Sequence, residues 1–169
     1  DVINGEYDDE FVLDVFQTGS GTSTNMNMNE VLSELCKIKY GAKVHPNDHV
    51  NMSQSSNDTI PSAIHVSAYI ALKRDLLPNL NLLSDTLMDR SISLTSTLKT
   101  GRTHLMDALP MTMGQEIGGW QKQIISNIER IETSYRRLGQ LALGGSAIGT
   151  GLNSSSQFTT LACEELSEQ

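Results

Sequence analysis

Two long segments of the chain carry apolar residues at intervals of three or four positions. The first runs from Ile64 to Leu98, and the second runs from Ile117 to Leu141. This spacing places the apolar side chains on one face of an α-helix, so both segments are predicted to be amphipathic helices. At ~1.5 Å per residue each would be on the order of 40–50 Å long, which exceeds the width of a compact domain of this size. We therefore expect an elongated helical bundle, and the broad apolar stripes suggest packing against other chains.

A shorter helix is predicted from Asn25 to Tyr40, with apolar residues on one face and Gly41 as its stop. Few segments show the alternation of a β-strand, so the sequence predicts an all-α fold. The chain begins without a clear helix cap, and its last residues, LACEELSEQ, end within a helical pattern. We therefore expect a piece of a longer protein.

The composition argues against several classes of function. Twelve Lys and Arg against 20 Asp and Glu give a net charge of −8, which argues against binding to nucleic acid or to an anionic membrane surface. No apolar run approaches the roughly 18 residues that span a bilayer, and we find no signal peptide. Two cysteines, Cys36 and Cys163, make a disulfide framework improbable. We expect a reducing compartment such as the cytoplasm, with no nucleic-acid or membrane partner.

A segment rich in hydroxyl and amide groups, QTGSGTSTNMNMNE, spans Gln17 to Glu30. It lacks the lysine of a P-loop and the third glycine of a dinucleotide-binding motif, so it matches neither phosphate site. Hydroxyl donors beside a helix N-terminus, whose backbone N–H groups carry a positive partial charge, suit a carboxylate. An ordinary helix cap and loop would explain about two of these residues but not the whole run.

Three further polar segments have both a structural and a functional interpretation. In SQSSNDTIPSAI, polar residues precede Pro61, which fits the first turn of the long helix. One of them should cap that helix, and the others are either structural or form a second donor cluster. In GRTHLMDALP, Thr103 and His104 lie in the short connection between the long helices, where a histidine is either an acid–base group or an ordinary surface residue. The four glycines of GGSAIGTGLN predict a tight backbone path.

Two histidines four positions apart, His45 and His49, superficially resemble a pair of metal ligands. Pro46 is expected to break the helix that would place both rings on one face, and no third ligand is evident. We therefore predict no metal site.

Four segments together resemble the class II fumarases of the fumarase/aspartase superfamily. They are QTGSGTSTNMNMNEV, KVHPNDHVNMSQSSNDTIPSAIHV, GRTHLMDALPMTMGQEIGGW and LALGGSAIGTGLN. The resemblance covers nearly the whole chain, with the segments in the same order and spacing. Aspartases of the superfamily typically read GRTQ and QSTND, whereas this chain reads GRTH at 101–104 and QSSND at 54–58. His104 and Ser56 therefore favour a fumarase.

The resemblance implies a homotetramer with a central bundle of long helices and active sites assembled from three subunits. Residues 1–58 would be part of an N-terminal domain, and residues 59–169 part of the central bundle domain. The implied reaction is the reversible hydration of fumarate to (S)-malate in the citric acid cycle, without a cofactor or metal. Removal of a C3 proton would give an aci-carboxylate, stabilised by helix N-termini and hydroxyl donors. The expected compartment is the cytoplasm, or the mitochondrial matrix in a eukaryote.

The resemblance also implies roles for individual residues. Thr103 and His104 would complete the catalytic pocket, His104 by orienting a carboxylate or relaying protons. The substrate carboxylates would be held by Ser20, Gly21, Thr22, Ser55, Ser56 and Asn57. A second dicarboxylate site would consist of His45, Pro46, Asn47 and Asp48. At that site Ala42 replaces an arginine that many relatives carry, which argues against binding there, and Lys43 is a poor substitute for a bidentate guanidinium.

One motif of the superfamily has no counterpart in the chain. No stretch matches the serine loop GSSxMPxKxN, which carries the proton-abstracting serine and a substrate-binding lysine and asparagine. A protein of these 169 residues alone is therefore expected to be inactive. Two alternatives stay open: an aspartate ammonia-lyase of the same superfamily, and a non-catalytic helical assembly module, since some superfamily members are structural lens proteins.

Overall fold

The computed structural model of the chain describes residues 1–17 and 19–168. The chain divides into two compact units, of which the first comprises Asp1–His65 and Leu141–Gln169 and the second comprises Val66–Gln140. Helix α2 (Ser56–Ala71) contributes residues to both units. The division into family domains at residue 58 stays a prediction.

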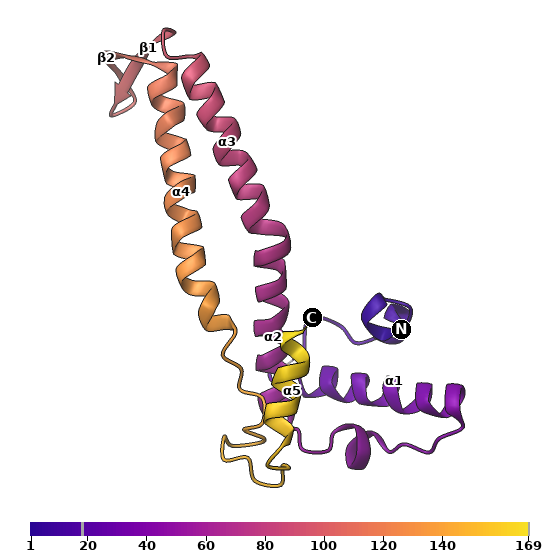
Figure 1. Ribbon diagram of the computed structural model, residues 1–169. Coiled ribbons are helices and arrows are strands. Elements are labelled where there is room, and N and C mark those ends of the chain that lie inside the picture. Colours follow the sequence, from indigo (N-terminus) through magenta and orange to yellow (C-terminus); the bar gives the residue numbers. More distant parts are fainter. Residues whose placement is uncertain (18, 169) are drawn as a thin grey trace. The chain divides into compact units, whose positions relative to one another are not determined.

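The first unit begins with two 3-10 turns, η1 (Val2–Asn4) and η2 (Asp8–Glu10), followed by helix α1 (Thr22–Tyr40) (Figure 1). α1 starts three residues before the predicted Asn25, because Gly21 adopts φ 67° and serves as its N-cap. The predicted stop is confirmed: Gly41 has φ 66°, and its N–H donates to the carbonyl oxygen of Lys37 at 3.0 Å.

The remaining elements of the first unit are a π-helical turn η3 (Pro46–Val50), the start of α2, and helix α5 (Phe158–Ser167). Pro46 is the first residue of η3, a position that needs no backbone N–H, and His45 before it is extended and lies outside the turn. Pro61 lies inside α2 and not in its first turn, because the helix already begins at Ser56.

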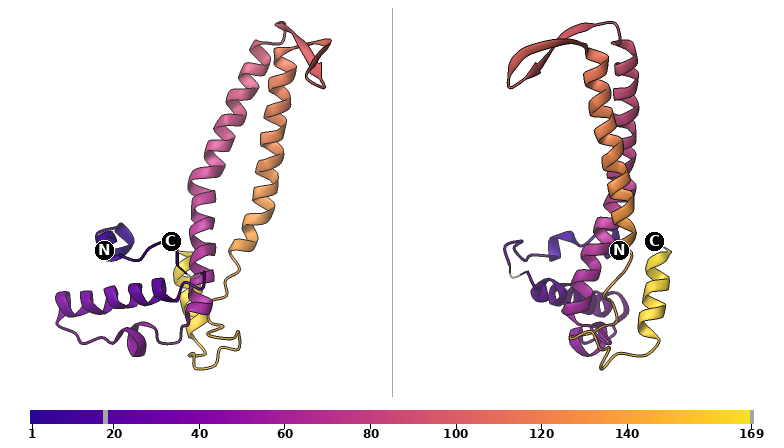
Figure 2. Two further views of the ribbon diagram at one scale, coloured as in Figure 1. Left: turned by 180° about the vertical axis from the view of Figure 1, so that it is seen from behind. Right: turned by 90° about the vertical axis from the view of Figure 1, so that its left-hand side faces the viewer.

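The second unit contains most of the long helical structure. A π-helical turn η4 (Leu72–Leu76) leads into α3 (Leu77–Ser93), and the flanking Ala71 and Leu77 keep right-handed helical dihedral angles. Helix α4 (Met113–Leu138) lies alongside α3 (Figures 1 and 2). Both predicted long helices are therefore present, although the first ends at Ser93 instead of Leu98 and the second ends at Leu138 instead of Leu141.

Helices α3 and α4 approach each other closely at Gly114. A Cβ atom added there would lie 2.4 Å from the carbonyl oxygen of Ser91. The Ser91 hydroxyl also donates to the carbonyl oxygen of Gly114 at 2.7 Å. The start of α4 is fixed by a capping box, in which Gln115 N–H donates to Thr112 Oγ1 and Thr112 N–H donates to Gln115 Oε1.

The connection between the long helices is an antiparallel β-hairpin, where a short loop was predicted. Its strands are β1 (Leu98–Thr103) and β2 (Met106–Thr112). Thr103 pairs with Met106, so His104 and Leu105 form a two-residue turn, with φ 51° and 61°. Positive φ at both central residues is the property of a type I′ turn. The prediction of an all-α fold holds, with this hairpin as a local addition.

Much of the apolar surface of the helices is not covered within the chain. Among the described residues, Ile128 is the one apolar side chain that is buried. Residues on the predicted stripes, such as Leu83 and Trp120, are 43% and 51% exposed. In the part of the chain that the structure describes, no helix is both long and apolar enough to cross a membrane.

Candidate active site

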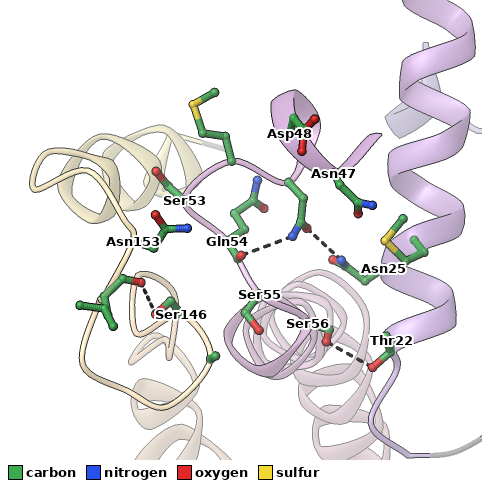
Figure 3. A pocket seen from close by; sticks show the side chains of 15 residues that line it. Thr22, Asn25, Asn47, Asp48, Ser53, Gln54, Ser55, Ser56, Ser146 and Asn153 are labelled. Carbon is green, nitrogen blue, oxygen red and sulfur yellow. Dashed lines mark hydrogen bonds between the residues drawn. The ribbon is translucent and has the colours of Figure 1, made fainter. Parts of the chain in front are cut away.

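The first unit contains a cavity of about 660 Å³, shown in Figure 3. Its walls come from the first turns of α1, from the stretch between η3 and the start of α2, and from the glycine-rich loop before α5. These are three of the four segments that the sequence singles out. Asp48 is the one charged residue among those that line the cavity, and the other polar lining residues are hydroxyls and amides.

Two helices begin at the wall of this cavity. Thr22 is the first residue of α1 and Ser56 is the first residue of α2, and both line the cavity. Their hydroxyl oxygens are 3.3 Å apart (Figure 3). The free backbone N–H groups of a helix N-terminus carry a positive partial charge and attract anions. The arrangement therefore offers neutral donors and two helix dipoles to an anionic group.

Gly21 allows the two helices to begin so close together. A Cβ atom at this position would lie 2.7 Å from Cγ2 and 2.9 Å from Cγ1 of Ile60, on the second turn of α2. Its left-handed conformation also disfavours any residue with a side chain. Gly21 does not line the cavity; its role in this structure is to let α1 start against α2.

One of the polar residues at 55–58 was predicted to cap α2, and the structure shows that it is Ser55, whose Oγ accepts a hydrogen bond from Asn57 N–H at 3.2 Å. In return, Asp58 Oδ1 accepts one from Ser55 N–H at 2.9 Å. Ser55 also lines the cavity. The structural interpretation is confirmed for Ser55, and its binding to a ligand stays a prediction.

A cluster of amides on the cavity wall was not predicted. The side-chain nitrogens of Asn25 and Asn29 both donate to Asn51 Oδ1, at 3.0 and 3.1 Å. Asn51 Nδ2 in turn donates to the carbonyl oxygen of Gln54 at 3.3 Å, beside the cap of α2. Asn25 and Asn29 are four residues apart on α1 and are both buried. Two asparagines at that spacing lie on one helix face, so the sequence already indicated that their side chains could share a partner.

The glycine-rich loop supplies the third wall, with Ser146 and Asn153 among its lining residues (Figure 3). The predicted substrate-binding residue Asn57 faces this loop, and its side chain donates to the carbonyl oxygen of Ala147 at 2.8 Å. Asn57 does not line the cavity, and neither does Ser20, which is exposed in the turn before α1. Of the six predicted substrate-binding residues, the cavity thus brings together Thr22, Ser55 and Ser56.

The residues of the predicted second dicarboxylate site lie in and before η3. His45 is the N-cap, and its Nδ1 accepts hydrogen bonds from Asn47 and Asp48 N–H at 3.3 and 3.1 Å. Asn47 and Asp48 line the cavity, whereas His45 and Pro46 do not. His45 N–H donates to Nδ1 of His49 at 2.8 Å. This turn orders the segment. The second site stays a prediction, as does the lack of binding expected there from Ala42.

Thr103 and His104 belong to the hairpin of the second unit. Thr103 is the last residue of β1, and His104 is the first residue of the type I′ turn. Their expected part in the same pocket as Thr22 and Ser56 stays a prediction.

No group of three or more His, Cys, Asp or Glu side chains could hold a metal ion in the described part of the chain. His45 and His49 lie close together, but their contact joins a backbone N–H to a ring nitrogen.

Comparison with known proteins places the chain in a family. A family model described as lyase matches residues 1–169. The chain is 52% identical over 166 residues to the class II fumarate hydratase of Corynebacterium glutamicum, covering 98% of this chain and 35% of that protein. It is 51% identical over 174 residues to the class II fumarate hydratase of Halobacterium salinarum, covering 100% of this chain and 37% of the relative.

A solved structure is similar as well. The crystal structure of recombinant class II fumarase from Schistosoma mansoni matches with a TM-score of 0.91 and 42% identity, over 99% of this chain and 36% of that one. The chain thus spans about a third of the length of the relatives it matches. By its sequence and its fold, the chain belongs to the lyase family that contains the class II fumarate hydratases.

Proposed function

We propose that the protein catalyses the reversible hydration of fumarate to (S)-malate in the citric acid cycle. The observation that carries the proposal is the meeting of two helix N-termini at one cavity, where Thr22 and Ser56 lie 3.3 Å apart. Neutral hydroxyl and amide donors beside two helix dipoles suit a carboxylate. The similar proteins that are named fumarate hydratases support the same reaction.

The donors at the start of α1 and α2 would hold the substrate carboxylates. In the dehydration direction, a base removes a C3 proton from malate and the adjacent carboxylate takes up the electron pair as an aci-carboxylate. Preorganised donors stabilise this developing charge more strongly than they stabilise the ground state, which lowers the barrier. Thr103 and His104 would complete the pocket. The residues at 45–48 correspond to the second dicarboxylate site, where Ala42 in place of an arginine argues against binding. No cofactor is required by this mechanism.

We further propose a cytoplasmic homotetramer, with the mitochondrial matrix as the compartment in a eukaryote. The support for an oligomer is the exposed apolar surface of the long helices, including Leu82 and Ile92, which are 65% and 63% exposed. The family resemblance supports shared active sites between subunits.

The proposal is tested with the protein at its full natural length by following the ultraviolet absorbance of fumarate after malate is added. Thr22→Val and Ser56→Ala should each raise the KM for malate by about tenfold to a hundredfold, the effect of losing one hydrogen bond to a charged group. Ser93→Ala is the matched control, because the hydroxyl of Ser93 donates to the carbonyl oxygen of Arg90 on the surface of α3. This control should change the KM less than about twofold.

Two results would replace the proposal. Release of fumarate and ammonia from aspartate, without malate turnover, would establish an aspartate ammonia-lyase. A folded protein that turns over neither substrate would establish a non-catalytic helical module.

A further inference from the structure

Asp58 is the most deeply buried charged residue that the structure describes, with 1% of its surface exposed. Its carboxylate accepts four hydrogen bonds from uncharged groups. Oδ1 accepts from Ser55 N–H at 2.9 Å and from Thr59 Oγ1 at 3.3 Å. Oδ2 accepts from Gly144 N–H at 3.0 Å and from Ser146 N–H at 2.8 Å. A carboxylate with this many donors is well stabilised without a cation.

The two oxygens of Asp58 serve different parts of the cavity wall. Oδ1 holds the turn that contains Ser55 and Ser56, whereas Oδ2 holds the glycine-rich loop, 86 and 88 residues away in sequence. The adjacent hydrogen bond from Asn57 Nδ2 to the carbonyl oxygen of Ala147 joins the same two segments. Ser55, Ser56 and Ser146 all line the cavity.

The loop is shaped to present its N–H groups to Asp58. Gly144 has φ 92°, and a Cβ atom there would lie 1.7 Å from Thr159 Oγ1 and 2.8 Å from Thr159 Cβ. A side chain at this position would therefore move the loop. Ser146 has φ 54°, a conformation that residues with side chains rarely adopt.

Helix capping alone does not account for Asp58. The N-terminus of α2 already has Ser55 Oγ as a cap, and the return bond of a capping box needs Oδ1 only. The two groups that donate to Oδ2, the N–H groups of Gly144 and Ser146, lie in the glycine-rich loop outside the helix. A buried negative charge beside a cavity for an anion opposes binding by Coulomb repulsion, so a neutral residue would be preferable if capping were its whole role.

We propose that Asp58 is a positioning residue, which clamps the loop 144–147 to the turn 55–57 and so sets the distance between two walls of the dicarboxylate cavity. This inference rests on the proposed function, because the substrate is the dicarboxylate assigned there.

The test uses Asp58→Asn in the protein at its full natural length. Asparagine has the same shape but only one acceptor oxygen, so its Nδ2 faces either the loop donors or Ser55 N–H. A misplaced wall should raise the KM for malate by about tenfold to a hundredfold, the effect of losing a hydrogen bond to a charged group. A purely structural role would instead reduce the fraction of folded enzyme, which lowers the apparent kcat and leaves the KM unchanged.

Gly144→Ala provides the second variant, because it displaces the loop donors while leaving the carboxylate in place. It should raise the KM in the same range, and the double variant should be no worse than the poorer single variant, since both changes open one clamp. If Asp58→Asn does not fold, the KM of Gly144→Ala alone decides the matter. Glu34→Gln is the control, as Glu34 forms an exposed ion pair with Lys37 on α1.

The positioning role would be overturned by an unchanged KM in folded Asp58→Asn or Gly144→Ala, or by additive effects in the double variant. Malate turnover by the wild type would still uphold the proposed function in that case. Absence of malate turnover in the wild type would overturn the proposed function itself.

Discussion

Replacing Gly21 by alanine should destabilise the junction between α1 and α2. An L-residue in the left-handed conformation costs roughly 1–2 kcal/mol, and the overlap of the new Cβ with the Ile60 side chain costs about 1–3 kcal/mol as overpacking. Alanine also has fewer conformations than glycine in the unfolded chain, and this lower entropy stabilises the folded state by roughly 0.4–1 kcal/mol. We expect the free energy of unfolding to fall by about 1–5 kcal/mol.

The assay is urea unfolding of the protein at its full natural length, followed by circular dichroism. Ile60→Ala removes the three side-chain atoms that the new Cβ would meet, Cγ1, Cγ2 and Cδ1. In that background, Gly21→Ala should cost about 1–3 kcal/mol less, since only the backbone strain remains. Gly19→Ala is the matched control, because a Cβ there meets no atom within 4 Å, and it should change stability by less than about 0.5 kcal/mol.

The close approach of α1 and α2 would be refuted if Gly21→Ala cost the same in both backgrounds, since the overlap with Ile60 would then be absent. Equal stability of Gly21→Ala and wild type would refute the left-handed start of α1 as well. A functional measurement accompanies the unfolding curve: the KM for malate should rise in Gly21→Ala, because the Thr22 hydroxyl leaves Ser56.

Three other changes test separate parts of the structure, each by urea unfolding. Asn51→Ala removes the common acceptor of two buried amides, Asn25 and Asn29, and should cost about 1–3 kcal/mol for each amide left unpaired, whereas a cost below 0.5 kcal/mol would contradict the cluster. Thr112→Ala removes the capping box of α4 and should cost about 1 kcal/mol; no loss would mean that the cap is not formed. Gly114→Ala should cost about 1–3 kcal/mol because its Cβ meets the Ser91 carbonyl oxygen. Gly119→Ala on the same helix should stabilise it by about 1 kcal/mol, because the added Cβ has no neighbour within 4 Å outside the helix backbone. Equal effects of the two glycine substitutions would contradict the close contact of α3 and α4.

The long helices could be predicted from the sequence because their apolar spacing persists over many turns. The stop at Gly41 was predictable for the same local reason, since glycine readily adopts the left-handed conformation that ends a helix. The hairpin was not predictable in this way. Its turn is formed by His104 and Leu105 where an Asn-Gly pair is the usual signal, and Pro110 within β2 argues against a strand.

The polar segments could be recognised as candidates, but their pairing could not. The sequence predicts a cap among the polar residues at 55–58 without showing which one it is, whereas the contact of Thr22 with Ser56 joins residues 34 positions apart. The bonds from Asp58 to the glycine-rich loop span a still longer stretch of chain. Such contacts depend on how the segments fold together, which local residue preferences do not encode.

The π-helical turn Leu72–Leu76, which joins α2 to α3, affects how the long helical segment tolerates changes in length. A turn closed by i→i+5 hydrogen bonds contains one residue more than a regular α-helical turn. Deleting one residue within it would restore the regular turn while the residues before and after keep their facing directions. The same deletion within α3 would rotate every following side chain by about 100° around the helix axis. Among relatives of this family, single-residue gaps in the alignment of this long helix should therefore fall at Leu72–Leu76.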